Sequence, residues 1–124
     1  LAKWAHDRGG RFIYHTDGNV QPLIPLFLEA GFDAIQPMEA KAGMDVRKLA
    51  PQYGDRLSFF GNIDMTIAIT NDPAKIKAEV TSKLAAGMER RGYAYHSDHS
   101  VPPQVSWESY KLILRLVDEY GVYA

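Results

Sequence analysis

The sequence predicts an α/β fold in which four short strands alternate with helices, and two observations lead to this prediction. Four runs rich in β-branched and aromatic residues recur along the chain, and each precedes a stretch with apolar residues at helical spacing. The 124 residues also divide into four units of about 31, enough for a strand, a helix and their connections. Such alternation is typical of a parallel sheet with right-handed crossovers.

The first unit begins with a strand at residues 11–15, which ends in the turn cluster of residues 16–19. Pro22 stands where the first turn of a helix tolerates proline, and Gly31 marks the end of that helix. The apolar face expected of this helix consists of Leu23, Ile24, Phe27 and Leu28.

The second unit has a strand at residues 33–36, which Pro37 ends, and a helix over residues 44–53. Pro51 lacks a backbone N–H, so we expect it to interrupt this helix or to start a new turn. The third unit has a strand at residues 57–60 and a loop at residues 61–64.

Asp72 and Pro73 then form a good helix start, with aspartate as N-cap and proline in the first turn. The apolar stripe of this helix is Ile76, Val80, Leu84 and Met88. The fourth unit has a strand at residues 93–96, a loop at residues 97–105 and a helix that Ser106 caps. The core face expected of this last helix is Tyr110, Ile113, Leu114 and Val117.

A complete (β/α)8 barrel takes ~250 residues. The chain is therefore either half of a (β/α)8 TIM barrel or a small open α/β sheet. No GxGxxG or Walker loop follows any strand, which disfavours the nucleotide-binding form of the open sheet.

The composition excludes several classes of protein and of site. A net charge of −1 disfavours a general nucleic-acid binder, which carries a basic stripe. The absence of cysteine excludes disulfides, thiolate zinc ligands and a cysteine nucleophile within this chain. No apolar run approaches the ~20 residues that span a bilayer. We therefore expect a cytoplasmic protein that binds a small molecule, with neither nucleic acid nor membrane as partner.

Polar side chains gather directly after the four strands. The carboxyl ends of parallel strands meet at one edge of the sheet, where active sites of such folds lie. We therefore expect the acidic, amide and imidazole side chains of four loops to lie close together at this edge, which we call the mouth. The residues concerned are His15, Asp17, Gln36, Glu39, Asn62, Asp64, His96, Asp98 and His99.

The residue types in this set allow two kinds of chemistry. Carboxylate and imidazole groups suit zinc or another divalent ion, and the same groups can act as metal-free general acids and bases. The spacing does not choose between these alternatives, and several of the residues also fit ordinary turns. The metal ligands, if a metal binds, would be His15, Asp17, Glu39 and His96.

Four segments together resemble the C-terminal half of the uroporphyrinogen decarboxylase superfamily, from about Phe12 to Tyr120. The segments are HTDGN, GFDAIQPME, YGDRLSFFGNID and HSDHSVPPQVSWESYKLILRLVDEYG. The resemblance implies a (β/α)8 barrel in which residues 1–124 supply the last four βα units. The N-terminal half of the barrel would then be the chain's partner.

The resemblance also implies two activities. The superfamily includes cofactor-free decarboxylases of porphyrin biosynthesis, in which a histidine after the last strand contacts the substrate, and His99 is the nearest match. It also includes zinc-dependent methyltransferases that work with corrinoid proteins or thiol acceptors. Those enzymes hold zinc by a His-x-Cys pair and a later cysteine, whereas this chain has His15-x-Asp17 and no cysteine.

Three hypotheses follow from the sequence. The first is a decarboxylase-like carboxy-lyase that needs no cofactor and acts on a porphyrinogen-type or other anionic substrate. The second is a metal-dependent methyltransferase that works with a corrinoid protein or a thiol acceptor, and the third is a non-catalytic fragment. Separately, we expect residues 1–124 alone to dimerise or aggregate through the open edges of the sheet. In the first, the expected catalytic residues are His99, His96, Asp98 and Asp17, and the expected substrate-binding residues are Asn62, Asp64, Gln36 and Tyr95.

Overall fold

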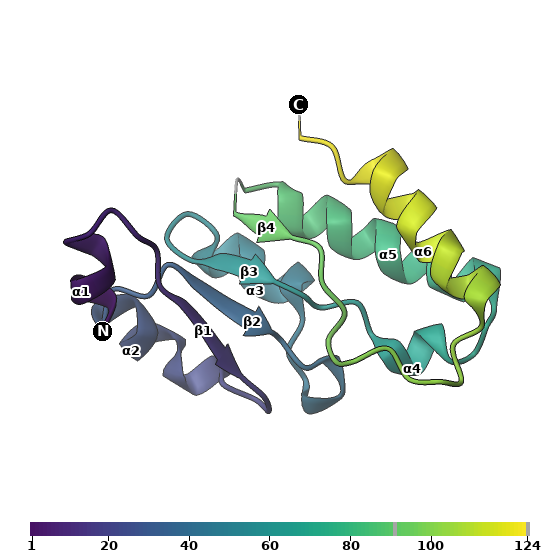
Figure 1. Ribbon diagram of the computed structural model, residues 1–124, viewed down its shortest axis with the longest axis horizontal. Helices are drawn as coiled ribbons and strands as arrows, with labels where there is room; N and C mark the ends of the chain where they lie inside the picture. The colour runs from purple at the N-terminus through teal and green to yellow at the C-terminus, as the bar shows by residue number, and fades with distance from the viewer. Residues whose placement is uncertain (91, 124) are drawn as a thin grey trace.

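Figure 1 shows the computed structural model of the chain, which describes residues 1–90 and 92–123. The strands are β1 (Ile13–Thr16), β2 (Ala34–Pro37), β3 (Ser58–Phe60) and β4 (Tyr93–Ala94). The α-helices are α1 (Ala2–His6), α2 (Ile24–Glu29), α3 (Val46–Tyr53), α4 (Met65–Ala68), α5 (Pro73–Met88) and α6 (Trp107–Tyr120). Two 3-10 turns, η1 (Gln21–Leu23) and η2 (Ala40–Ala42), lie between them.

The four strands form one parallel sheet in the order β1-β2-β3-β4. Each strand therefore lies beside the next strand of the sequence, as it does in a (β/α)8 barrel. A doubly wound open sheet places some strands out of sequence order instead. The prediction of four parallel βα units is confirmed, and the strand order is that of half a barrel.

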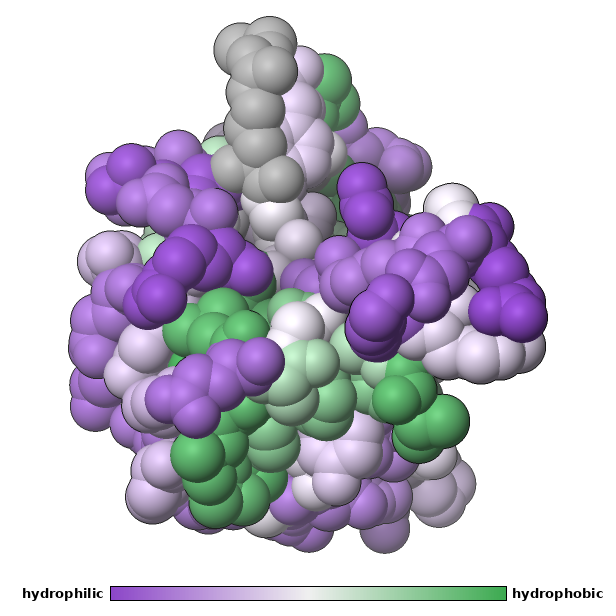
Figure 2. Space-filling model, turned by 90° about the vertical axis from the view of Figure 1, so that its left-hand side faces the viewer, coloured by the Kyte–Doolittle hydropathy of each residue, from purple (hydrophilic) through white to green (hydrophobic). Residues whose placement is uncertain are grey.

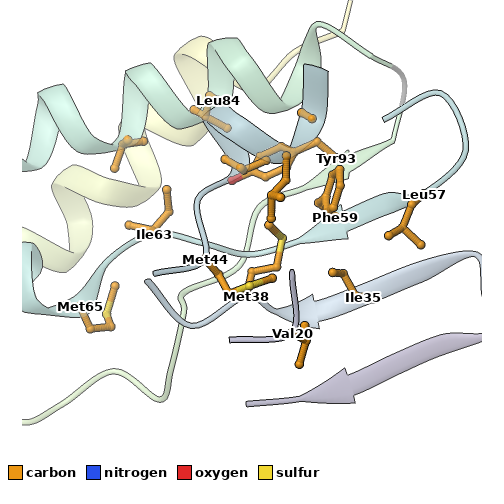
Figure 3. Packing of buried hydrophobic residues seen from close by; sticks show 14 of the residues in the cluster. Val20, Ile35, Met38, Met44, Leu57, Phe59, Ile63, Met65, Leu84 and Tyr93 are labelled. Carbon is orange, nitrogen blue, oxygen red and sulfur yellow. The ribbon is translucent and has the colours of Figure 1, made fainter. Parts of the chain in front are cut away.

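The two faces of the sheet differ in what covers them. Ile35, Phe59 and Tyr93 point to the face that the helices cover, and they belong to the main apolar core (Figure 3). Side chains alternate along a strand, so Gln36 and Phe60 point to the opposite face. Ile13 lies on that face too and is 50% exposed. The face that lines the interior of a barrel is thus left largely open.

The caps predicted for the two longest helices are confirmed. Asp72 Oδ1 accepts hydrogen bonds from the backbone N–H groups of Ala74 at 2.9 Å and Lys75 at 3.3 Å. The hydroxyl of Ser106 accepts one from the N–H of Ser109 at 3.1 Å. In each case a polar side chain satisfies backbone donors that have no partner within the helix.

Two residues expected in the core are exposed instead, Leu23 by 44% and Leu114 by 37%. Leu23 belongs to the 3-10 turn η1, where the angle between successive side chains differs from that of an α-helix. In α6 the buried side is centred on Ile113 and Leu116, which turns Leu114 outward.

Other boundaries differ from the predictions. The loop after β3 continues into α4, which was not predicted, and Pro51 lies inside α3 without ending it. β4 stops at Ala94, and pairing resumes only as an isolated bridge between Ile63 and Ser97. Within residues 1–90 and 92–123, no helix combines the length and apolar character needed to cross a bilayer.

Candidate active site

The side chains of three units meet at the carboxyl edge of the sheet. His15 lies directly across from Gln36 in the register of β1 and β2. The side-chain oxygen of Gln36 is hydrogen-bonded to His15 Nδ1, and its nitrogen lies 3.1 Å from His96 Nε2. The convergence predicted for these residues is confirmed, and a glutamine joins the two imidazoles.

These contacts fix where the protons lie on the two rings. The Gln36 oxygen can only accept, so His15 Nδ1 carries a hydrogen, and the Gln36 nitrogen donates to His96 Nε2. His96 Nδ1 is hydrogen-bonded to the carbonyl oxygen of Ser97, so this nitrogen carries the hydrogen of that ring. Both ring nitrogens of His96 are therefore engaged, whereas His15 Nε2 makes no hydrogen bond within residues 1–90 and 92–123.

Glu39 holds the turn after β1 to the loop after β2. Its Oε2 accepts a hydrogen bond from the Gly18 N–H at 2.8 Å, and its Oε1 lies 3.2 Å from the Lys41 ammonium. The Gly18 bond, followed by the Lys41 contact, lowers the pKa of Glu39, and the nearby His99 adds a smaller effect in the same direction. His15, Glu39 and His99 thus lie at the same edge of the sheet.

The four predicted metal ligands do not come together in one coordination sphere. Within the described part of the chain, no group of three or more histidine, aspartate or glutamate side chains is arranged to hold an ion. Glu39 is occupied by Gly18 and Lys41, Asp17 is exposed in its turn, and His96 has both nitrogens engaged. This arrangement does not fit the predicted metal set.

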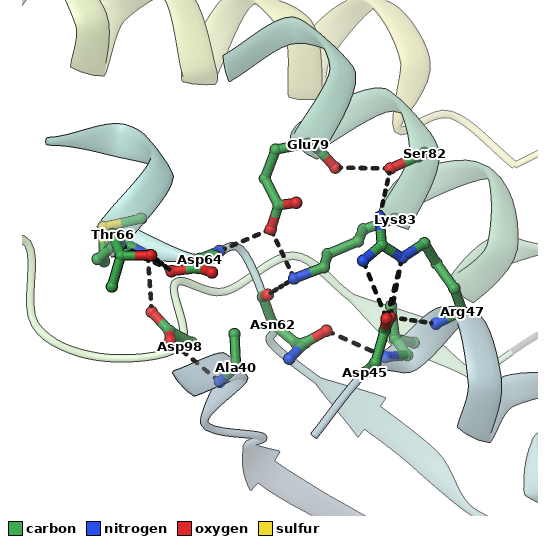
Figure 4. Close-up of polar contacts among 12 residues, drawn as sticks. Ala40, Asp45, Arg47, Asn62, Asp64, Thr66, Glu79, Ser82, Lys83 and Asp98 are labelled. Atoms are coloured by element: carbon green, nitrogen blue, oxygen red, sulfur yellow. Dashed lines mark hydrogen bonds and ion pairs between the residues drawn. The ribbon is translucent and has the colours of Figure 1, made fainter. Parts of the chain in front are cut away.

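Asn62 is fully buried beneath the mouth (Figure 4). Its Oδ1 accepts from the Val46 N–H at 3.0 Å, and its Nδ2 donates to the carbonyl oxygens of Met38 at 2.6 Å and Met44 at 2.8 Å. The substrate-binding role expected for Asn62 is thereby corrected, because the amide has no exposed atom to offer a substrate. It fastens the loop after β2 to the end of β3.

Asp64 also has a structural place. Its Oδ1 accepts hydrogen bonds from the N–H of Thr66 at 2.7 Å and the hydroxyl of Thr66 at 2.6 Å, which makes it the N-cap of α4. Its own N–H donates to Glu79 Oε1 at 2.9 Å. The carboxylate expected to bind substrate instead starts a helix.

A buried ion pair on α5 supports this loop (Figure 4). Lys83 is only 2% exposed, and its ammonium lies 2.5 Å from Glu79 Oε1 and donates to the Asn62 carbonyl oxygen at 2.6 Å. Neither Lys83 nor Glu79 is among the site residues predicted from the sequence. A signal was present, because Lys83 falls on the apolar stripe of Ile76, Val80 and Leu84, where a charged side chain must be paired.

Asp98 joins two loops at the mouth. It is 2% exposed, and its two oxygens accept from the N–H groups of Ala40 at 3.1 Å and Met65 at 3.0 Å. Burial raises the pKa of Asp98, although both hydrogen bonds act against this rise. The structure therefore places Asp98 as a clamp that fixes the base of the His99 loop.

His99 itself is exposed and borders a cavity of about 310 Å³. Its lining also includes two charged residues, Lys41 and Asp98, and two apolar residues, Met65 and Ile69. Tyr95 is half-buried against the core, and burial raises its pKa to about 12. Together with His15, His99 is an imidazole that a ligand at the mouth could reach.

Comparisons with known proteins show which family the chain is similar to. The family model described as Uroporphyrinogen decarboxylase (URO-D) matches residues 1–120. Uroporphyrinogen decarboxylase of Pelodictyon phaeoclathratiforme is 31% identical over 80 residues, which cover 62% of this chain and 22% of that protein. The Pseudomonas aeruginosa enzyme is 31% identical over 101 residues, covering 75% of this chain and 28% of that protein.

Among solved structures, a methyltransferase from Methanosarcina mazei has the same fold with a TM-score of 0.71 and 24% sequence identity. The superposition covers 98% of this chain and 34% of that one. The chain thus spans about a quarter of the curated relatives it matches, 22–28% of their length. The match along residues 1–120 and the half-barrel order of the strands establish that the chain belongs to the uroporphyrinogen decarboxylase family.

Proposed function

We propose that this chain supplies the C-terminal half of the mouth of a uroporphyrinogen decarboxylase-like carboxy-lyase in the cytoplasm. The observation that supports this most is the hydrogen-bonded series His15–Gln36–His96 at the carboxyl edge of three strands. It holds the imidazole of His15 in a fixed orientation, with no partner for Nε2 among the described residues, as a general acid or base requires. The complementary half of the barrel would supply the other wall of the site.

The chemistry of such a reaction suits these side chains. Loss of carbon dioxide from a pyrrole acetate needs protonation of the ring first and a proton for the product carbon afterwards. Positioned acids suffice for both steps, and no cofactor is required. His15 and His99 would exchange these protons, His96 and Gln36 would orient His15, and Asp98 would hold the His99 loop.

One cation at the mouth, Lys41, could contact an anionic substrate, beside the carboxylates of Glu39 and Asp98. Lys41 is 60% exposed beside the cavity that His99 borders, although Glu39 neutralises part of its charge. The apolar groups of Met65 and Ile69 in the same lining suit a substrate that combines carboxylates with an apolar frame.

The test uses the whole barrel protein that contains this segment, with uroporphyrinogen III as substrate and chromatography of the products. We expect His15→Ala and His99→Ala each to lower kcat by roughly 10²–10⁴-fold, the usual contribution of a general acid or base. His6→Ala is the control, because His6 pairs with Asp33 at the opposite end of the strands. Equal activity of all three variants and the wild type would contradict the proposal.

Methyl transfer is the second candidate function. His15 Nε2 has no partner among the described residues and could bind an ion, while Gln36 holds Nδ1, as a second-shell group usually holds the other nitrogen of a metal-ligating histidine. The other ligands of a zinc ion would have to come from outside this chain, and a corrinoid protein would be the partner. Elemental analysis of the barrel protein separates the candidates, because stoichiometric zinc with methyl transfer to a corrinoid would replace the decarboxylase proposal. An isolated chain that binds no substrate would match the third hypothesis, a non-catalytic fragment.

A further inference from the structure

One wall of the cavity that His99 borders is the loop of residues 99–104, and α4 forms a second wall. The loop contributes Ser100, Pro102 and Gln104 to the lining. Figure 1 shows this loop passing α4 on its way to α6, away from the end of the molecule where Figure 2 shows exposed apolar side chains. Both walls therefore come from the last two βα units of this chain.

The loop has a defined shape but few contacts of its own. The Val105 N–H donates to the Pro102 carbonyl oxygen at 3.0 Å, which closes a turn with Pro103 at its second position. The two prolines have restricted φ angles, so this turn is stiff. Within residues 1–90 and 92–123, the backbone of residues 99–103 makes no hydrogen bond to the backbone of another element. The contacts at the two ends of the loop therefore decide where this wall lies.

Each end of the loop is anchored by one side chain. Asp98 fixes the start through its hydrogen bonds to two other loops. Asn71 fixes the far end, because its Nδ2 donates to the Gln104 carbonyl oxygen at 3.0 Å and its Oδ1 accepts from the Ser106 N–H at 2.8 Å. A single amide thus ties the end of the loop to the turn between α4 and α5.

The backbone conformation of Asn71 shows why asparagine suits this position. Its φ is +52°, in the left-handed region that asparagine adopts more readily than most residues other than glycine. Glycine would adopt the same φ, but it has no side-chain amide to reach the loop. Asn71 therefore combines this turn conformation with hydrogen bonds to residues 33 and 35 positions further along the chain.

We propose that Asn71 is a positioning residue, which sets the width of the cavity by holding the far end of the loop of residues 99–104. This inference rests on the proposed function, because it takes the cavity as the place of the substrate. His99 follows directly on Asp98, whose hydrogen bonds do not involve Asn71, so proton transfer should not depend on Asn71. Substrate binding should depend on it, because Asn71 holds the Gln104 end of the wall.

The test uses the whole barrel protein with uroporphyrinogen III and replaces Asn71 by residues that tolerate its φ. Asn71→Gly removes both hydrogen bonds, and it should raise KM roughly 2- to 13-fold, the factor that one neutral hydrogen bond provides, with kcat unchanged. Asn71→Asp keeps the acceptor for the Ser106 N–H and loses the donor to Gln104, so its KM should lie between those of Asn71→Gly and the wild type. Thr70→Ala is the matched control and should behave as the wild type, because among the described residues the Thr70 hydroxyl bonds only within the segment that joins α4 to α5.

Amide hydrogen exchange at Ser106 gives a second readout that does not need turnover. Exchange should be roughly 2- to 13-fold faster in Asn71→Gly than in the wild type or in Thr70→Ala. Unchanged exchange, an unchanged KM, or a fall in kcat in place of the rise in KM would overturn this inference alone. A wild type that does not turn over uroporphyrinogen III would overturn the proposed function, and this inference with it.

Discussion

Replacement of Asn62 by alanine gives the sharpest test of how the mouth is held together. Asn62 is fully buried and makes three hydrogen bonds to the backbone, with Val46, Met38 and Met44. Each such bond contributes about 1 kcal/mol, and backbone groups left unpaired in the interior add to the loss. We expect Asn62→Ala to lower the free energy of unfolding by about 3–5 kcal/mol, a large share of the ~5–15 kcal/mol of a typical domain.

Urea denaturation of the wild type and the variant measures this loss. The control is Asn19→Ala, because Asn19 is exposed and accepts a single hydrogen bond from Gln21 N–H at 3.1 Å. Its cost should stay below about 1 kcal/mol. Asn62→Ala and Asn19→Ala could instead lower the free energy of unfolding equally, with a loss of substrate affinity in Asn62→Ala. That result would contradict the structural role of Asn62 and support the substrate-binding role expected from the sequence.

Three further predictions concern the same region. Gly61 has φ +140°, and a Cβ there would lie 2.0 Å from the Pro37 carbonyl oxygen. Gly61→Ala should therefore lower the free energy of unfolding by more than about 3 kcal/mol. Gly9→Ala is the control and should lower it by about 1 kcal/mol, because a Cβ at Gly9 would meet no atom within 4 Å. Lys83→Met should lower the stability measured by thermal unfolding by about 3–5 kcal/mol, because it leaves the Glu79 carboxylate buried without its cation. Lys75→Met is the control and should lower it by less than ~1 kcal/mol, because Lys75 is 61% exposed. Burial raises the pKa of Asp98 above its ordinary 3.8, so its contribution to stability is fully present below that value and is lost as the pH rises through the folded-state pKa. The stability of the wild type relative to Asp98→Asn should therefore fall as the pH rises from about 4, and a rise over this range would refute the assignment.

The sequence was sufficient for the parts of the fold that local rules determine. Asp72 and Ser106 are caps because their side chains accept hydrogen bonds from N–H groups two or three residues later, which have no partner within the helix. The alternation of strands and helices along the sequence was enough to predict the parallel sheet. Leu114 was misplaced because residues at helical spacing define a broad face, and only packing against α5 decides which side of α6 is buried.

The candidate site was predictable in its location and less so in its roles. Parallel strands bring their carboxyl ends together, so the meeting of His15, Gln36 and His96 followed from topology. The backbone groups that capture Asn62 and Asp98 belong to loops whose path no spacing rule describes. The sequence therefore predicts a catalytic or substrate-binding role for every polar residue after a strand. In the structure, Asn62 and Asp98 instead hold the neighbouring loops in place through hydrogen bonds to their backbone.

The central claim is that three units converge on one mouth through Gln36. Nitrogen-15 NMR of the histidine rings, together with nuclear Overhauser effects from the Gln36 amide protons, tests it most directly. The structure predicts that both rings are Nδ1–H tautomers and that the Gln36 amide shows cross-peaks to His15 and His96. An Nε2–H tautomer on either neutral ring, with no cross-peak from Gln36, would contradict the account.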